Sequence, residues 1–142
     1  MNYKIDSDII GLDLGQARTG VARIHPVARI AEPLEHIVMK DGDFTEAVES
    51  VVAQHMASCV VVGMPRGLNG QETDQTKWAQ QMQRDLESSL QVPVFAIDEA
   101  VTTQHAEKRA RPDQSIDSVA AGIIAEDFVH ELAEGRIENA SI

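Results

Sequence analysis

The sequence predicts an α/β fold in which a mixed five-stranded sheet carries helices on both faces. Three strand-like segments come first, and helical and strand-like segments then alternate. Strands followed by alternating helix and strand are typical of a mixed sheet with covering helices. The run Cys59–Val62 is continuously apolar, as expected for a strand that is covered on both faces.

The first three strands fall within residues 9–38. Ile9–Leu14 is a short apolar run that ends at Gly15, and Thr19–Ile24 follows after a hairpin connection. A third strand covers part of Ala28–Val38. Pro33 interrupts this strand or places it at an edge of the sheet, because proline cannot donate to a strand ladder.

Two helices flank the buried strand that begins at Cys59. Asp43 is a candidate N-cap for a helix over residues 44–55. The strand is followed by a glycine-rich loop over residues 63–70, and Thr73 or Asp74 caps the next helix. Apolar residues recur every four positions on that helix, which predicts a core-facing stripe. The stripe consists of Trp78, Met82, Leu86 and Leu90.

The C-terminal part is predicted to be mainly helical after one more strand. The fifth strand is Val94–Asp98, and Thr102 or Thr103 caps a short helix to about Ala110. Residues 111–114 then form a turn. Ser115 caps the last helix, and the tail from Gly135 is expected to fray.

Length and composition predict a single domain over residues 1–142. A chain of this size can bury a core without disulfides, and its one cysteine, Cys59, is expected in that core. No apolar run is long enough to span a bilayer, and two acids precede any apolar stretch at the N-terminus. We therefore expect a cytoplasmic protein without a membrane partner.

The net charge of −11 argues against non-specific binding to nucleic acid, which depends on clustered Lys and Arg. The charge is uneven, because residues 112–142 contribute −6 and residues 1–111 contribute −5. Several bases in the first segment could still form a local basic surface, although each one alone is more simply a solvated surface charge. They are Arg18, Arg66, Lys108, Arg109 and Arg111.

Three acidic positions stand where apolar residues would be expected. Asp13 interrupts a buried strand, the pair Asp98-Glu99 ends another, and Asp117 lies on the inward face of the last helix. Strand side chains alternate, so only one of Asp98 and Glu99 can face the site, and we favour Glu99. Simpler alternatives are a favourable helix-dipole position for Asp117 and strand-terminal turn chemistry for Asp98-Glu99.

Carboxylates gathered in a core are costly to ionise unless a divalent cation neutralises them together. Oxygen-only ligands select Mg²⁺ or Mn²⁺ over Zn²⁺. Two such ions suit phosphodiester hydrolysis, because one activates water and the other stabilises the leaving oxygen. The acids therefore predict a metal-dependent site for phosphodiester chemistry.

The segment Gly11–Ala22 resembles the opening motif of the YqgF family, also called RuvX. The similarity continues in the same order along nearly the whole chain, and this order makes a set of short motifs specific. The other matching segments are Val61–Pro65, Leu68–Gly70, Val92–Val94, Asp98-Glu99, Thr102-Thr103 and Ile116–Ala121.

The resemblance implies a ribonuclease H-like fold and a nuclease that processes the 5′ end of precursor 16S rRNA, with Holliday junction resolution as the alternative. It implies Asp13, Glu99 and Asp117 as catalytic residues and metal ligands. Its expected partners are precursor rRNA or branched DNA and ribosomal particles, for a monomer or homodimer. Expected nucleic-acid contacts are Arg18, Arg66, Asn69, Thr102, Thr103, Lys108 and Arg109.

This sequence departs from the family pattern at two places. Ala100 stands where the family usually has Arg, which removes a cation from the rim of the site. The segment between Glu99 and Asp117 is also shorter than usual.

Two other classes of protein are alternatives to a nuclease. An actin-like or sugar-kinase-like ATPase needs two copies of such a core, and 142 residues supply one. A catalytically silent nucleic-acid- or ribosome-binding module agrees with the acidic charge and the missing Arg, but not with the retention of all three acids.

Overall fold

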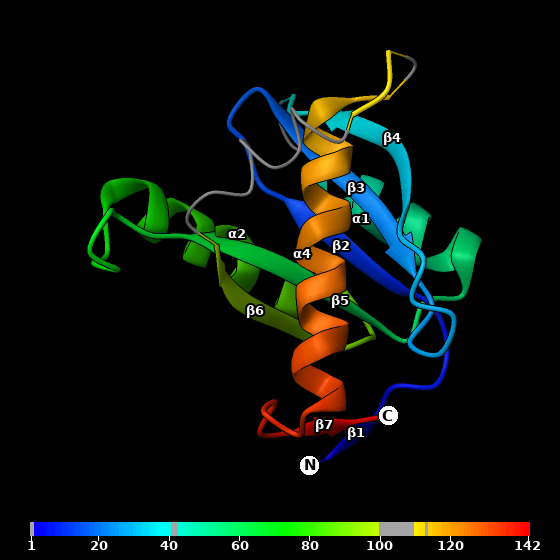
Figure 1. Cartoon of the computed structure of the whole chain (residues 1–142). Helices are drawn as coiled ribbons and strands as arrows, with labels where there is room; N and C mark the ends of the chain where they lie inside the picture. Colours follow the sequence, from blue (N-terminus) through cyan, green and yellow to red (C-terminus); the bar gives the residue numbers. More distant parts are fainter. Residues whose placement is uncertain (1, 41–42, 100–109, 113) are drawn as a thin grey trace.

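Five strands form one mixed sheet in the structure, a computed structural model that describes residues 2–40, 43–99, 110–112 and 114–142. The strand order is β4-β3-β2-β5-β6. Strands β4, β3 and β2 pair antiparallel, whereas β2, β5 and β6 pair parallel. The expected mixed five-stranded sheet is therefore confirmed (Figure 1). The strands are Ile9–Asp13 (β2), Arg18–Ile24 (β3), Glu32–Val38 (β4), Cys59–Pro65 (β5) and Val94–Glu99 (β6).

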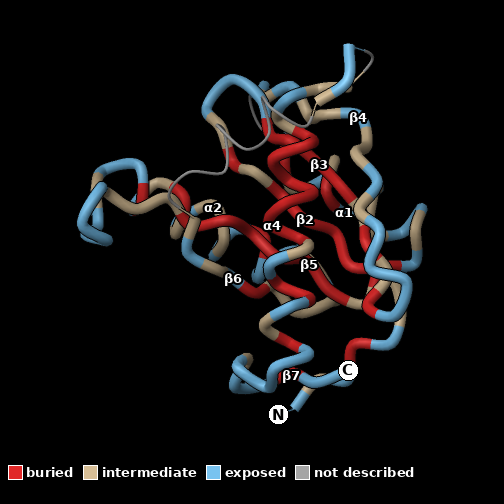
Figure 2. The backbone as a smooth tube through the Cα atoms, viewed as in Figure 1, coloured by how far each residue is buried: buried red, intermediate tan, exposed pale blue. Residues whose placement is uncertain are grey.

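Helices cover both faces of this sheet. Helix α4 (Ile116–Ala133) crosses one face, and α1 (Phe44–His55) and α2 (Asp74–Ser89) lie behind the other (Figure 1). Most of the buried residues accordingly fall into a core cluster on the α4 side and another on the α1 and α2 side, and a smaller cluster contains Val119, Ala120 and Ile123 of α4. Figure 2 shows the central strands and most of α4 as the buried part of the molecule.

Side chains alternate between these two cores along each strand, as the period of a β-strand requires. On β2, Ile9 packs with the α4 core, whereas Ile10 and Leu12 pack with the α1 and α2 core. Gly11 lies against α4, because a Cβ built there would meet the backbone of Ala121 and the side chain of α4 Ala125. This alternation decides which acidic side chains share a face.

The helix N-termini follow the sequence prediction with one difference. Thr73 caps α2, and its side chain and that of Thr76 bond reciprocally to each other's backbone N–H groups. Ser115 caps α4 by accepting from the Ser118 N–H at 3.4 Å. Asp43 occupies the N-cap of α1 without a side-chain cap bond, because its backbone is already αR rather than extended.

The prediction that the tail frays from Gly135 is wrong. Ala140–Ser141 (β7) pairs parallel with Tyr3–Lys4 (β1) as a separate two-stranded sheet. The Tyr3 N–H donates to the Asn139 carbonyl at 2.8 Å, and Ala140 is buried. The two ends of the chain are therefore fastened to each other.

The structure also tests the predicted end of β5 and the predicted position of Pro33. Strand β5 continues to Pro65, three residues beyond the predicted end at Val62. Pro33 does lie on an edge strand, because β4 ends the sheet. The short helix expected from Thr102 or Thr103 falls outside the described residues, and in the described part of the chain no helix is long and apolar enough to cross a membrane.

Candidate active site

Two of the expected acids lie at one edge of the sheet. Asp13 is the last residue of β2, Glu99 is the last residue of β6, and β5 lies between these strands. The three strands are parallel, so their carboxyl ends meet at the same edge. This is the edge at which open α/β sheets bind ligands.

Asp13 and Glu99 also share the face that α4 covers. Asp13 follows Gly11 by two residues, and Glu99 follows Ile97, which packs with the α4 core. A Cβ built on Gly63 of β5 would overlap Ile124 of α4 and lie 3.4 Å from the Glu99 Cγ. The Glu99 stem therefore lies beside α4, over the backbone of β5.

Asp98 points to the other side of the strand. Its Oδ1 accepts a hydrogen bond from the Nε of Arg66 at 3.0 Å, and its side chain is 68% exposed. The alternation of β6 thus separates the two neighbouring acids, which supports Glu99 rather than Asp98 as the partner of Asp13.

The first turn of α4 places Asp117 next to Asp13. Gly20 of β3 is opposite Asp13 in the sheet register, and a Cβ on Gly20 would overlap the backbone carbonyl of Asp117. The buried Ser118 hydroxyl accepts from the Val21 N–H at 3.2 Å, which ties the same turn to β3. Glycine at position 20 is therefore what lets the helix backbone rest directly on the strand.

The two acids differ in their electrostatic surroundings. The pKa of Asp13 is raised from its usual 3.8 to about 6, mainly by burial and in part by the neighbouring Asp117 carboxylate. Asp117 has a cation beside it, because Arg18 donates from Nε to Asp117 Oδ2 at 2.7 Å. Asp13 is thus the acid with most to gain from a bound cation.

The side chains could supply oxygen ligands only, which fits a hard divalent cation such as Mg²⁺ or Mn²⁺. Within residues 2–40, 43–99, 110–112 and 114–142, no group of three or more His, Cys, Asp or Glu residues is arranged to hold a metal ion. The structure brings Asp13 and Asp117 together, and it places Glu99 on the same face and edge.

The expected nucleic-acid contacts have mixed positions. Arg18 contacts Asp117 and is 56% exposed, so it lies at the rim of the site. Arg66 is paired with Asp98 and Glu72, and Asn69 is exposed in the loop after β5. Four further expected contacts lie outside the described residues, namely Thr102, Thr103, Lys108 and Arg109.

The sequence did not indicate which contacts position the acids, although Arg66 was among its expected nucleic-acid contacts. Gly20 and Ser118 bring α4 onto β3, and Arg66 fixes Asp98. A glycine in the interior of a strand is a signal of close backbone approach and could have pointed to Gly20. Nothing local in the sequence links Arg66 to a carboxylate 32 residues away.

Comparison with known proteins gives a consistent assignment. The family model RuvX, described as Holliday junction resolvase, matches residues 7–131. A protein of Hydrogenovibrio crunogenus is 35% identical over 135 residues, covering 93% of this chain and 100% of its own length. One of Pelotomaculum thermopropionicum is 34% identical over 140 residues, with 92% and 91% covered. Both carry the description "Putative pre-16S rRNA nuclease".

Solved structures agree in fold. Thermus thermophilus RuvC in complex with a Holliday junction substrate matches with a TM-score of 0.64 at 15% identity, over 91% of this chain and 97% of that one. A second Thermus thermophilus RuvC structure matches with a TM-score of 0.56 at 14% identity, over 94% and 98%. The chain therefore belongs to the RuvX family, and the ribonuclease H-like fold and the nuclease class expected from its sequence are confirmed.

Proposed function

We propose that the chain is a metal-dependent nuclease that hydrolyses phosphodiester bonds in structured nucleic acid, and that it processes the 5′ end of precursor 16S rRNA. The observation that carries the proposal is the placement of Asp13 beside Asp117 at the carboxyl edge of the sheet, with Glu99 on the same face. The relatives described as pre-16S rRNA nucleases support the choice of substrate.

Asp13, Glu99 and Asp117 would hold the metal, Mg²⁺ or Mn²⁺, if Glu99 moved toward the two aspartates, because the three do not form a ready metal-binding group among the described residues. A bound divalent ion would supply activation of water and stabilisation of the leaving oxygen. The fit rests on the oxygen donor set and on the raised pKa of Asp13, which results from burial and from the neighbouring Asp117 carboxylate. Arg18 pairs with Asp117 through its bond to Oδ2 and lies at the rim of the site.

The proposed substrate surface surrounds this site. Arg18 is exposed enough to meet a phosphate while it contacts Asp117. Asn69 lies on the exposed loop after β5, and the further proposed contacts are Thr102, Thr103, Lys108 and Arg109. A single domain over residues 1–142, binding to ribosomal particles, a monomer or homodimer and a cytoplasmic location all stay predictions.

Two alternatives each have an observation in their favour. The description of the matching family model favours Holliday junction resolution. The net charge of −11 favours a silent binding module, because a polyanion is held by clustered bases.

The deciding experiment compares cleavage of a precursor 16S rRNA fragment with that of a four-way DNA junction. Each is tested in Mg²⁺, in Mn²⁺ and in EDTA, with Asp13→Asn as the inactive control. We expect metal-dependent cutting of the RNA that Asp13→Asn abolishes. Preferential cutting of the junction would favour the resolvase alternative, and binding of either substrate without cutting would favour the silent module.

A further inference from the structure

We propose that Arg66 is a positioning residue, which holds the end of β6 through Asp98 so that Glu99 is presented on the α4 face. The sequence had suggested a substrate contact for Arg66 instead. The inference rests on the proposed function only where it treats Glu99 as a metal ligand.

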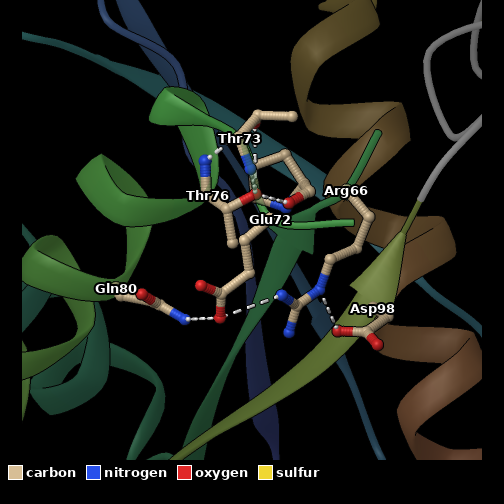
Figure 3. Close-up of polar contacts among 7 residues, drawn as sticks. Arg66, Glu72, Thr73, Thr76, Gln80 and Asp98 are labelled. Atoms are coloured by element: carbon tan, nitrogen blue, oxygen red, sulfur yellow. Dashed lines mark hydrogen bonds and ion pairs between the residues drawn. The ribbon is translucent and has the colours of Figure 1, made fainter. Parts of the chain in front are cut away.

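Arg66 is the first residue after β5 and bridges two carboxylates from different segments (Figure 3). Its Nε donates to Asp98 Oδ1 at 3.0 Å, and its Nη1 donates to Glu72 Oε1 at 3.5 Å. Glu72 Oε1 also accepts from Gln80 Nε2 at 3.2 Å. The Arg66 side chain is only 21% exposed, whereas that of Asp98 is 68% exposed. The guanidinium is therefore occupied by carboxylates and largely covered.

The segment from which Arg66 projects is itself fixed. The buried Thr76 of α2 donates from Oγ1 to the Pro65 carbonyl at 2.5 Å, which ties the start of α2 to the end of β5. The Gly67 N–H donates to the Gln71 carbonyl at 2.9 Å and closes the intervening loop. Arg66 thus reaches Asp98 from an anchored position.

The sheet holds the end of β6 less firmly than the ends of β2 and β5. Strand β6 is an edge strand with β5 as its sheet neighbour, and its last register partner, Pro65, brings no N–H to the ladder. Asp98 and Glu99 point to opposite faces, because strand side chains alternate. Holding Asp98 on its own side therefore fixes the direction in which Glu99 leaves the strand.

The two roles for Arg66 predict different effects of Asp98→Asn. If Arg66 were a substrate contact, loss of the competing carboxylate would free the guanidinium for phosphate, and substrate binding would tighten. If Arg66 positions the strand end, the same change loosens Glu99 and weakens metal binding. Whether substrate affinity rises or Mn²⁺ affinity falls therefore separates the two roles.

The test measures Mn²⁺ affinity by calorimetry without substrate, and kcat and KM on a precursor 16S rRNA fragment. We expect Arg66→Ala and Asp98→Asn each to weaken Mn²⁺ binding by about tenfold and to lower kcat, with KM within about twofold of the parent. The double variant should resemble either single variant, because both remove one contact. Arg66→Lys should restore part of the loss, since it keeps the charge but not the fork.

Two control variants are measured in the same assays. Glu72→Gln breaks the longer arm of the bridge and should change Mn²⁺ affinity by less than about twofold. Arg23→Ala removes the ion pairs of Arg23 with Asp8 and Glu32, which lie at the opposite end of β2 from Asp13, and should change neither metal affinity nor kcat. Thermal melting of all variants identifies any that fail to fold, and Asp98→Asn then carries the test.

A lower KM in Asp98→Asn, or a higher KM in Arg66→Ala with Mn²⁺ affinity unchanged, would overturn the proposal. If the parent protein neither binds Mn²⁺ nor cleaves, the proposed function has failed, and the positioning role is then judged by amide hydrogen exchange at residues 97–99. Faster exchange in both single variants supports it, and unchanged exchange overturns it.

Discussion

The two halves of the candidate site are held in place by different forces. Asp117 is positioned by backbone packing, because the start of α4 rests on Gly20 and Ser118 bonds to β3. Glu99 is positioned at an edge strand whose end is fastened by the Arg66–Asp98 ion pair. Packing tolerates almost no added volume, whereas an ion pair whose carboxylate is exposed contributes modestly. The comparison predicts that mutations in the first half act mainly through stability and those in the second half through metal geometry.

Gly20→Ala should give the largest effect on the fold. The new Cβ would overlap the Asp117 carbonyl, a backbone atom that cannot move without shifting α4. We expect a loss of about 3 kcal/mol in the free energy of unfolding, measured by urea denaturation, together with loss of cleavage. Gly122→Ala is the control, because its Cβ would lie 3.3 Å from the Ala31 Cβ and should cost less than about 1 kcal/mol. Parental stability in Gly20→Ala would show that α4 does not rest on β3 as described.

Asp13→Asn should separate activity from stability. Cleavage should be lost, because a proposed ligand charge is removed. The metal-free protein at pH 7.5 should become more stable by about 2 kcal/mol, since the variant no longer holds a partly buried carboxylate beside Asp117. Chemical denaturation in EDTA measures this. Destabilisation of the variant would mean that Asp13 has a structural role.

The raised pKa of Asp13 also predicts a pH dependence with a definite sign. In the folded state the pKa is about 6, and in the unfolded state it is near 3.8. Well below pH 3.8 both states are protonated, so Asp13 contributes no pH dependence there. Between pH 4 and pH 6 the unfolded state loses its proton first, so stability falls as pH rises. The difference in unfolding free energy between the parent and Asp13→Asn, measured in EDTA from pH 4 to pH 8, should grow up to about pH 6 and then level. A flat difference would contradict the pKa of Asp13.

Arg18→Ala should have the smallest effect on the fold. The Arg18–Asp117 pair is largely exposed, so its loss should cost less than about 1 kcal/mol of stability. Substrate affinity should fall, and the slope of log affinity against log salt should become shallower by about one unit, because one phosphate contact is lost. Filter binding across a salt titration measures both, with Mn²⁺ affinity as the control that should change little. Unchanged substrate binding would strengthen the silent-module alternative.

Much of the architecture could be predicted because burial leaves a periodic pattern in the sequence. The continuously apolar run from Cys59 indicates a strand that is covered on both faces, and the stripe containing Leu86 indicates a helix with one buried face. Strand alternation likewise predicts that Asp98 and Glu99 point to opposite faces. The features that were predicted wrongly depend on contacts with residues that are distant in the sequence. Residues 63–65 suggested a loop because glycine and proline are poor strand formers, although Ile124 of α4 occupies the space a side chain at Gly63 would need.

Long-range contacts also explain the other misses. The pairing of Tyr3–Lys4 with Ala140–Ser141 joins segments that carry no strand pattern of their own. The Arg66–Asp98 bond likewise joins two charged residues that each suggest only a solvated surface. Contacts of this kind depend on the finished fold and leave no local trace in the sequence.

The parallel pairing of β1 with β7 brings the two ends of the chain next to each other. The two termini lie side by side beyond the C-terminal end of α4, whereas Asp117 lies in its first turn (Figure 1). The 18 residues of α4 span roughly 27 Å, so about that distance separates Asp117 from the end of the helix beside the joined termini. A short linker between the termini would close the chain without approaching Asp13 or Asp117. Tethers or fusion partners attached at either end would leave the site open to a large nucleic-acid substrate.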